Sequence, residues 1–224
     1  STSQNWAVWV PDYLSRYDPD PLRYYLSVNM PETGDTDFSW SEFIARNNNE
    51  LVATYGNLVN RVLTFTYRNF DGCVPQPGEL DSQSQTLIKK AEDTFANVDK
   101  LLYGCHFREA IRSAMSLAQE TNRYLDEKAP WKMIKENKQA AGASLYVAIG
   151  VISFLKNIFY PFLPFSSQKV HEYLGFGGKI EDAGWQPRIP QAGQKLMEPK
   201  TLFVKLDKAV AEEETARLGQ AQPH

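Results

Sequence analysis

The segment from Gln139 to Tyr160 constrains the fold more than any other part of the chain, because it is almost wholly apolar. A helix of this composition has no polar face for solvent, so it must be buried on all sides. Its most apolar part, Leu145 to Leu155, ends at Lys156 and is shorter than the roughly 18 apolar residues that a membrane-spanning helix needs. We therefore expect the centre of a helical bundle, and no stretch long enough to span a membrane.

Other segments with helical periodicity supply the rest of this bundle. Apolar residues spaced three and four apart predict a long amphipathic helix from Ser41 to Arg68. Further helices are expected at 82–103, 107–125 and 166–174, and Pro130 is well placed to begin another one. The predicted fold class is all-α, a helical bundle preceded by a small mixed α/β linking module.

The two ends of the chain differ in character from the middle. Residues 1–40 combine the strand-like Trp6–Val10 with short helical patterns that begin at prolines, which indicates the linking module. Residues 176–224 begin as a linker rich in glycine and proline, continue through a strand-like return segment at Leu202–Leu206, and end in an acidic tail that we expect to fray. The bundle itself is predicted at 41–175.

Composition and charge limit the partners and the compartment. Charged residues make up 23% of the chain and the net charge is -3, so a generally basic surface that binds any nucleic acid is excluded. A polyanion must use a local patch, and we predict no DNA and no membrane partner. The polar Ser1–Asn5 predicts no secretory leader, and the spacing of Cys73 and Cys105 fits a reducing cytoplasm. The chain has no initiator methionine, and we expect Ser1 to follow a longer upstream polypeptide.

No self-contained active site is expected in this chain. His106, His171 and His224 have no motif that links them to a nucleophile or a metal, so surface or capping roles are predicted. Asp35 and Asp37 lie in a turn where aspartate is common, and no glycine-rich phosphate loop follows a strand. We predict no metal, no bound cofactor and no catalysis by the chain alone.

The polar side of the 41–68 helix is the first candidate binding surface. Opposite its apolar side lies a stripe of polar side chains, formed by Asn57, Arg61, Thr64 and Arg68. Solvated helix faces favour Glu and Lys, whereas an amide and two guanidiniums form directional hydrogen bonds with base edges and phosphates. The stripe favours RNA binding, with an ordinary solvated face as the alternative.

The second candidate surface surrounds Trp131, which follows Pro130 at a predicted helix start. Basic residues flank it on both sides: Arg123, Lys128, Lys132, Lys135 and Lys138. An indole in a basic rim can stack on an unpaired RNA base, worth about 1 to 3 kcal/mol per base, while the lysines attract phosphates. The alternative is a tryptophan that only packs on the bundle.

Four motifs, in this order, resemble class I methionyl-tRNA synthetases. Ser1-Thr2-Ser3 and the following Gln4–Trp9 resemble the end of the signature loop that stabilises ATP in this family, with Thr2 at the position of its second lysine. The resemblance continues through the module that links the catalytic domain to the bundle in this family, at the segments Asp20–Leu26 and Met30–Thr33. Asn57–Arg61 and Ala129–Trp131 resemble the anticodon-reading residues, and the likeness extends to about Asp207.

This resemblance implies recognition of the CAU anticodon of methionine tRNA. Asn57 and Arg61 would hydrogen-bond anticodon bases, and Trp131 would stack on the first one. Further RNA contacts are expected from Asn60, Thr64, Arg68, Lys128, Pro130, Lys132 and Lys135. The parent enzyme would join methionine to its tRNA with ATP and magnesium. Its catalytic domain would be the partner of this chain within the same polypeptide. Any zinc would bind in that catalytic domain.

Two other functions remain open from the sequence. The chain could be a helical protein-interaction module in which the Trp131 region is an apolar anchor and RNA has no part. It could also be the bundle of another class I synthetase, which should lack the combination of Asn57, Arg61 and Trp131.

Overall fold

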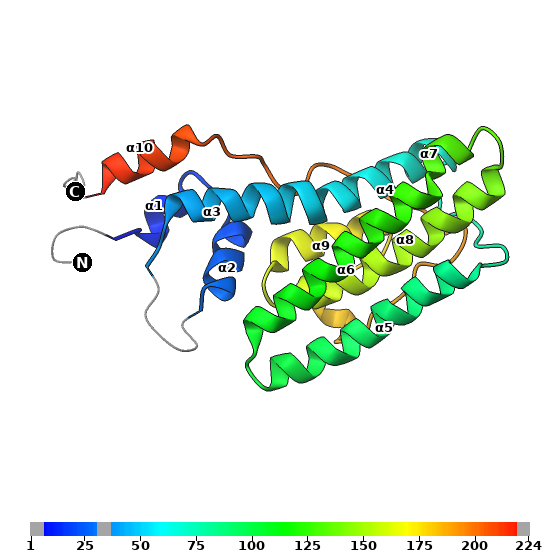
Figure 1. Cartoon of the computed structure of the whole chain (residues 1–224), viewed down its shortest axis with the longest axis horizontal. Helices are drawn as coiled ribbons and strands as arrows, with labels where there is room; N and C mark the ends of the chain where they lie inside the picture. The colour runs from blue at the N-terminus through cyan, green and yellow to red at the C-terminus, as the bar shows by residue number, and fades with distance from the viewer. Residues whose placement is uncertain (1–6, 31–36, 219–224) are drawn as a thin grey trace.

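The computed structural model describes residues 7–30 and 37–218, and helices dominate them (Figure 1). A small N-terminal group precedes the bundle and a last helix returns to it, as the element order shows: α1 (Val10–Leu14), α2 (Pro19–Val28), α3 (Trp40–Arg46), η2 (Asn47–Gly56), α4 (Asn57–Asn69), α5 (Ser82–Tyr103), α6 (Phe107–Lys128), α7 (Pro130–Met133), α8 (Lys138–Phe159), α9 (Pro164–Tyr173), η3 (Glu181–Ala183) and α10 (Ala209–Arg217). The described residues contain no strand and one isolated antiparallel bridge, between Cys73 and Lys195. The all-α fold class is confirmed.

Helix α8 lies at the centre of the bundle, packed against α4, α5, α6, α7 and α9 (Figure 1). By length and composition alone it could cross a membrane, and it is the one helix of the described ranges that passes this test. The expectation that no stretch is long enough was therefore wrong. Its central position is confirmed, because 89% of its most apolar window is buried inside the protein, which explains its composition.

The helix expected at 41–68 runs unbroken from α3 through η2 to α4, but its middle is a π-helix. Ser39 begins it by accepting a hydrogen bond from the backbone N–H of Glu42 at 3.3 Å. A π-helix is wider than an α-helix and frequently marks a functional segment. The position of the π-helix was not predictable from apolar spacing, because its boundaries depend on what packs against it.

The side chains of η2 explain why Leu202–Leu206 is not a strand. The Asn47 amide donates to the Val204 carbonyl at 2.9 Å, and the Asn48 amide both donates to the Leu206 carbonyl at 2.8 Å and accepts from its N–H at 2.9 Å. These amides satisfy backbone groups that would otherwise need a neighbouring strand. The strand predicted at Trp6–Val10 is also wrong for residues 7–10, which the structure describes. Residues 7–9 are irregular, and Val10 begins α1.

The acidic tail, which we expected to fray, instead forms the helix α10 up to Arg217. Glu214 is only 4% exposed, and it accepts hydrogen bonds from the Arg16 guanidinium at 3.0 and 2.9 Å and from the Tyr17 hydroxyl at 2.8 Å. Burial, and then Glu214 itself, raise the pKa of Tyr17 to about 12. An ion pair between residues far apart in sequence therefore holds the tail on the N-terminal helices, which local composition does not predict.

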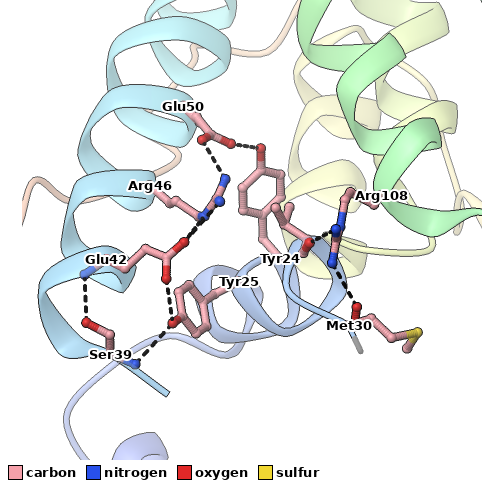
Figure 2. A network of polar contacts seen from close by, with 9 residues as sticks. Tyr24, Tyr25, Met30, Ser39, Glu42, Arg46, Glu50 and Arg108 are labelled. Carbon is pink, nitrogen blue, oxygen red and sulfur yellow. Dashed lines mark hydrogen bonds and ion pairs between the residues drawn. The ribbon is translucent and has the colours of Figure 1, made fainter. Parts of the chain in front are cut away.

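A polar network joins α2 to the helix formed by α3 and η2 (Figure 2). Arg46 donates to Glu42 and to Glu50, each at 3.0 Å. Glu50 also accepts from the Tyr24 hydroxyl, and Glu42 accepts from the Tyr25 hydroxyl at 3.3 Å. Burial, and then the charge of Glu50, raise the pKa of Tyr24, so this phenol stays protonated and keeps donating. The network ties α2 to the long helix that continues into the bundle.

Candidate nucleic-acid interface

The structure brings Arg61 of α4 and Trp131 of α7 into direct contact. The guanidinium carbon of Arg61 lies 4.4 Å from the centroid of the Trp131 ring, within the range of a cation–π interaction. The local cause is the break between α6 and α7, where Ala129 adopts a left-handed conformation with φ of 42° and Pro130 begins α7. This tight reversal places the indole against α4 rather than further along α6.

Two side chains of α6 orient the Arg61 guanidinium. It donates to the Asp126 carboxylate at 3.1 Å and, at the longer distance of 3.4 Å, to the Asn122 side chain. The Nε atom of Arg61 is buried and has no hydrogen-bond partner within the described structure. Phe65, one turn further along α4, meets the Trp131 ring edge-on at 6.4 Å. The guanidinium is thus positioned by the polar side chains of α6 and by the Trp131 ring, which Phe65 supports, and its Nε is buried without a partner.

Sequence reasoning did not identify Asn122 and Asp126 as part of this surface. The two residues are four apart, so they share one face of α6, and that spacing was readable. Their contact with Arg61 was not readable, because it depends on how α4 and α6 pack against each other.

The other predicted residues of α4 follow the same helix but have different contacts. Asn57 is exposed in the first turn, one turn before Arg61, and Arg68 is exposed in the last turn. The Thr64 hydroxyl donates to the Asn60 side chain at 3.2 Å, so these two groups are partly engaged with each other. The described contacts therefore join Arg61 directly to Trp131, with Asn57 placed beside them along the helix.

The basic rim around Trp131 is less uniform than its sequence suggests. Lys132 and Lys135 are exposed, whereas Lys128 forms an ion pair with Asp81 and lies 5.7 Å from the centroid of the Tyr124 ring. Hydrogen bonds from Lys128 and Ser84 lower the pKa of Asp81 to about 2. This pair fastens the end of α6 to the start of α5, where Asp81 accepts from the Ser84 N–H at 2.9 Å.

Pro130 and Trp131 differ in accessibility. Pro130 is buried at the start of α7, so it presents little surface to a partner, and its role as an RNA contact stays a prediction. Trp131 is partly exposed, and it also packs against the hydrophobic core. Its position is compatible both with a stacking platform and with a packing residue.

The remaining predicted positions contribute no second site. Ser1, Thr2 and Ser3 lie outside the described residues, as do Asp35 and His224. His106 is exposed, whereas His171 is only 2% exposed, so the surface role predicted for it is wrong. Its Nε2 lies 3.3 Å from the Gly177 carbonyl beyond the end of α9, and burial lowers its pKa. Within residues 7–30 and 37–218, no group of three or more His, Cys, Asp and Glu side chains could hold a metal ion.

Comparison with known protein families adds independent information. Residues 1–63 match the family model described as tRNA synthetases class I (M), and residues 74–222 match the anticodon binding domain of methionyl tRNA ligase.

Individual relatives match almost all of this chain but only part of their own length. The chain is 60% identical over 219 residues to a methionine-tRNA ligase of Dehalococcoides mccartyi (strain ATCC BAA-2266 / KCTC 15142 / 195), covering 98% of this chain and 40% of that protein. It is 45% identical over 244 residues to a methionine-tRNA ligase of Roseiflexus castenholzii, covering 97% and 41%. The chain therefore spans about 40% of the length of these curated relatives.

Solved structures support the fold. Mycobacterium tuberculosis methionyl-tRNA synthetase in its apo form superposes with a TM-score of 0.78 at 24% identity, covering 84% of this chain and 39% of the other. The same enzyme bound by methionyl-adenylate gives a TM-score of 0.77, also at 24% identity, with coverage of 83% and 37%.

Proposed function

Because this chain belongs to the methionyl-tRNA ligase family, we propose that it recognises the CAU anticodon of methionine tRNA. The observation that carries this proposal is the contact between the Arg61 guanidinium and the Trp131 indole, which come from separate helices and lie 4.4 Å apart. Unpaired anticodon bases offer both a flat face and their hydrogen-bonding edges. An indole, a guanidinium and the nearby amide of Asn57 match those two kinds of surface.

Each group has a distinct role in the proposed complex. Trp131 stacks on the first anticodon base, and Asn57 and Arg61 hydrogen-bond base edges. Arg61 does so through the terminal N–H groups that its bonds to Asp126 and Asn122 leave unused, because its Nε is buried. Lys132 and Lys135 attract phosphates because they are exposed. Asn60, Thr64 and Arg68 extend the surface along α4, and Lys128 contributes only if it leaves Asp81.

The proposal places this chain within a larger enzyme that attaches methionine to its tRNA with ATP. The matching synthetase bound by methionyl-adenylate supports ATP-dependent activation in the parent, and magnesium would accompany the nucleotide. Binding energy from the anticodon then helps to position the acceptor end of the tRNA at the distant catalytic domain. The chain alone catalyses nothing in this scheme, and the free thiols of Cys73 and Cys105 suit a cytoplasmic enzyme.

The test is a titration of the chain with methionine tRNA and with the same tRNA carrying a changed anticodon, at two salt concentrations. Tryptophan fluorescence reports binding, because Trp131 lies on the proposed surface. Tighter binding of the CAU tRNA at both salt concentrations is the expected result. Equal binding of the two tRNAs, or no binding, would favour the helical protein-interaction module instead.

A second prediction concerns Arg61. Replacement by alanine should reduce the preference for the CAU anticodon by about 1 to 3 kcal/mol, because a guanidinium reading a base edge is lost. Folding should change little, since Asp126, its ion-pair partner, is 66% exposed and such pairs are weak. The measurement is the ratio of dissociation constants for the two tRNAs.

The matched variant is Arg61→Lys, which keeps the charge but loses the planar fork. We expect it to bind both tRNAs with low discrimination. If Arg61→Ala weakens both tRNAs equally, Arg61 contacts phosphate rather than a base.

A further inference from the structure

One exposed face of α6 connects the N-terminal helices to the Arg61 and Trp131 contact. Four side chains with hydrogen-bond donors follow it at positions i, i+4, i+7 and i+11, which lie on the same side of an α-helix: Arg112, Ser116, Gln119 and Arg123. All four are exposed. We name this set the α6 track, and at 1.5 Å per residue it is about 16 Å long.

The α6 track begins beside a cleft and ends beside the residues that hold Arg61. At one end Arg112, Ser116 and Gln119 line a cleft of about 610 Å³ between α6, α2 and η2. At the other end the track reaches the turn of α6 that carries Asn122 and Asp126, the two residues that hold Arg61. Figure 1 shows α6 running along the bundle from α2 towards α7, so the track spans this distance on one continuous helix.

The cleft end is held in shape by Arg108 (Figure 2). Its guanidinium donates to the backbone carbonyls of Val28 and Met30, each at 3.0 Å. Arg108 is thereby occupied in fixing the end of α2 against α6. It forms one wall of the cleft, and Arg112 is the next guanidinium along the helix.

The track is positively charged although the whole chain is not. Three acids near it are paired with bases: Glu120 with Lys90, Asp126 with Arg61, and Glu50 with Arg46. Two further exposed acids flank it on α6, Glu109 before Arg112 and Glu127 after Arg123. No ion pair joins Arg112 or Arg123 to an acid within the described part of the chain. Although the net charge of the chain is -3, the four residues of the α6 track themselves carry two guanidiniums and no acid.

The chemistry of the track selects a phosphate backbone rather than exposed bases. The sequence from Ile111 to Arg123 contains no Phe, Tyr or Trp, so the track offers no ring on which a base could stack. Guanidinium, hydroxyl and amide donors are the groups that bind phosphate oxygens and ribose hydroxyls. A base-paired RNA arm presents these groups outward and hides its base edges.

We propose that the α6 track binds the phosphate backbone of the double-helical arm that leads to the anticodon. This inference rests on the proposed function and adds to it a second surface with a different chemistry. The Arg61 and Trp131 contact reads unpaired bases, whereas the α6 track holds the paired arm without reading its sequence. The two surfaces together fix the direction in which the RNA leaves the anticodon.

The test compares the whole chain with Arg112→Gln/Arg123→Gln and with the control Lys169→Gln/Lys179→Gln, which removes two exposed charges from α9 and the loop after it. The probe is an RNA hairpin with a paired stem and a CAU loop, titrated at several salt concentrations, beside the same hairpin with a changed loop. We expect the α6 double variant to bind the CAU hairpin roughly 10-fold more weakly at low salt, with a salt slope smaller by about 1 to 2. The ratio of affinities for the two loops should stay at its original value.

Each contrary outcome has a separate meaning. If the unaltered chain does not distinguish the two loops, the proposed function fails and this inference fails with it. If the unaltered chain distinguishes them but the α6 double variant keeps its affinity and salt slope, only the α6 track is overturned. An equal loss in the Lys169→Gln/Lys179→Gln control would also overturn it, because the effect would then be one of overall charge.

Discussion

Replacing Trp131 by alanine should weaken the binding of methionine tRNA by about 1 to 3 kcal/mol, a loss of about 5- to 150-fold. The physical reason is that a partly exposed indole supplies the flat surface for the first anticodon base, and alanine supplies none. Arg61 loses its aromatic neighbour at the same time, so the guanidinium is held only by Asp126 and Asn122. The measurement is a titration with the CAU tRNA at a temperature well below the unfolding transition.

Controls separate this role from packing, because Trp131 also touches the hydrophobic core. Trp131→Phe keeps an aromatic ring and should recover much of the affinity. Trp185 is another partly buried tryptophan, whose ring lies tilted against that of Phe95 at 4.9 Å between centroids, and Trp185→Ala should lower stability without lowering affinity. A Trp131→Ala variant that melts much earlier yet binds tRNA normally would show that Trp131 is only a packing residue.

Replacing Lys156 by methionine should stabilise the protein at pH 7 by about 1 to 2 kcal/mol. Lys156 is 1% exposed in the central helix and has no acidic partner among residues 7–30 and 37–218; it contacts the Asn157 side chain at 2.6 Å and the Phe176 ring at 5.4 Å. Burial, and then the charge of Arg188, lower the pKa of Lys156 to about 8. Burying the charged Lys156 side chain costs about 3 kcal/mol of folding free energy at neutral pH. Methionine removes this cost but also loses the hydrogen bond to Asn157, which offsets about 1 to 2 kcal/mol of the stabilisation.

The pH dependence of this effect has a definite sign. The unfolded lysine titrates near 10.4, so between pH 8 and that value the unfolded state binds more protons than the folded state. The free energy of unfolding contributed by this group therefore rises with pH through this window, by about 2 kcal/mol between pH 7 and pH 9.5. Lys156→Met should lack the rise, and its advantage should shrink accordingly.

Urea unfolding at pH 7 and pH 9.5 checks this prediction, with Lys169→Met as the control because Lys169 is exposed on α9. The control should follow the unaltered chain at both pH values. A difference between Lys156→Met and the unaltered chain that does not change with pH would contradict the lowered pKa. Comparing variants at equal pH cancels the opposing effect of the buried tyrosines, whose pKa values are raised.

Most helices were predictable because their information is local. The segment 82–103 was expected as a helix and is α5, and Gln139–Tyr160 was expected at the centre and is α8, shifted by one residue. Apolar spacing reports which face of a helix is buried, and a helix without a polar face can only be central. The same reasoning placed Asn57 and Arg61 on the outer face of their helix, where the structure has them only partly buried or exposed.

The sequence by itself determined that the chain is helical, which segment lies at its centre, and which polar side chains can face a partner, because spacing along one helix settles these features. Only the tertiary structure decided that Arg61 lies over Trp131, that Asn47 and Asn48 replace a strand partner for the return segment, and that Glu214 is buried beside Arg16. Those contacts join residues up to 198 positions apart. Their energies depend on how whole helices pack, and no local pattern of residues encodes that packing.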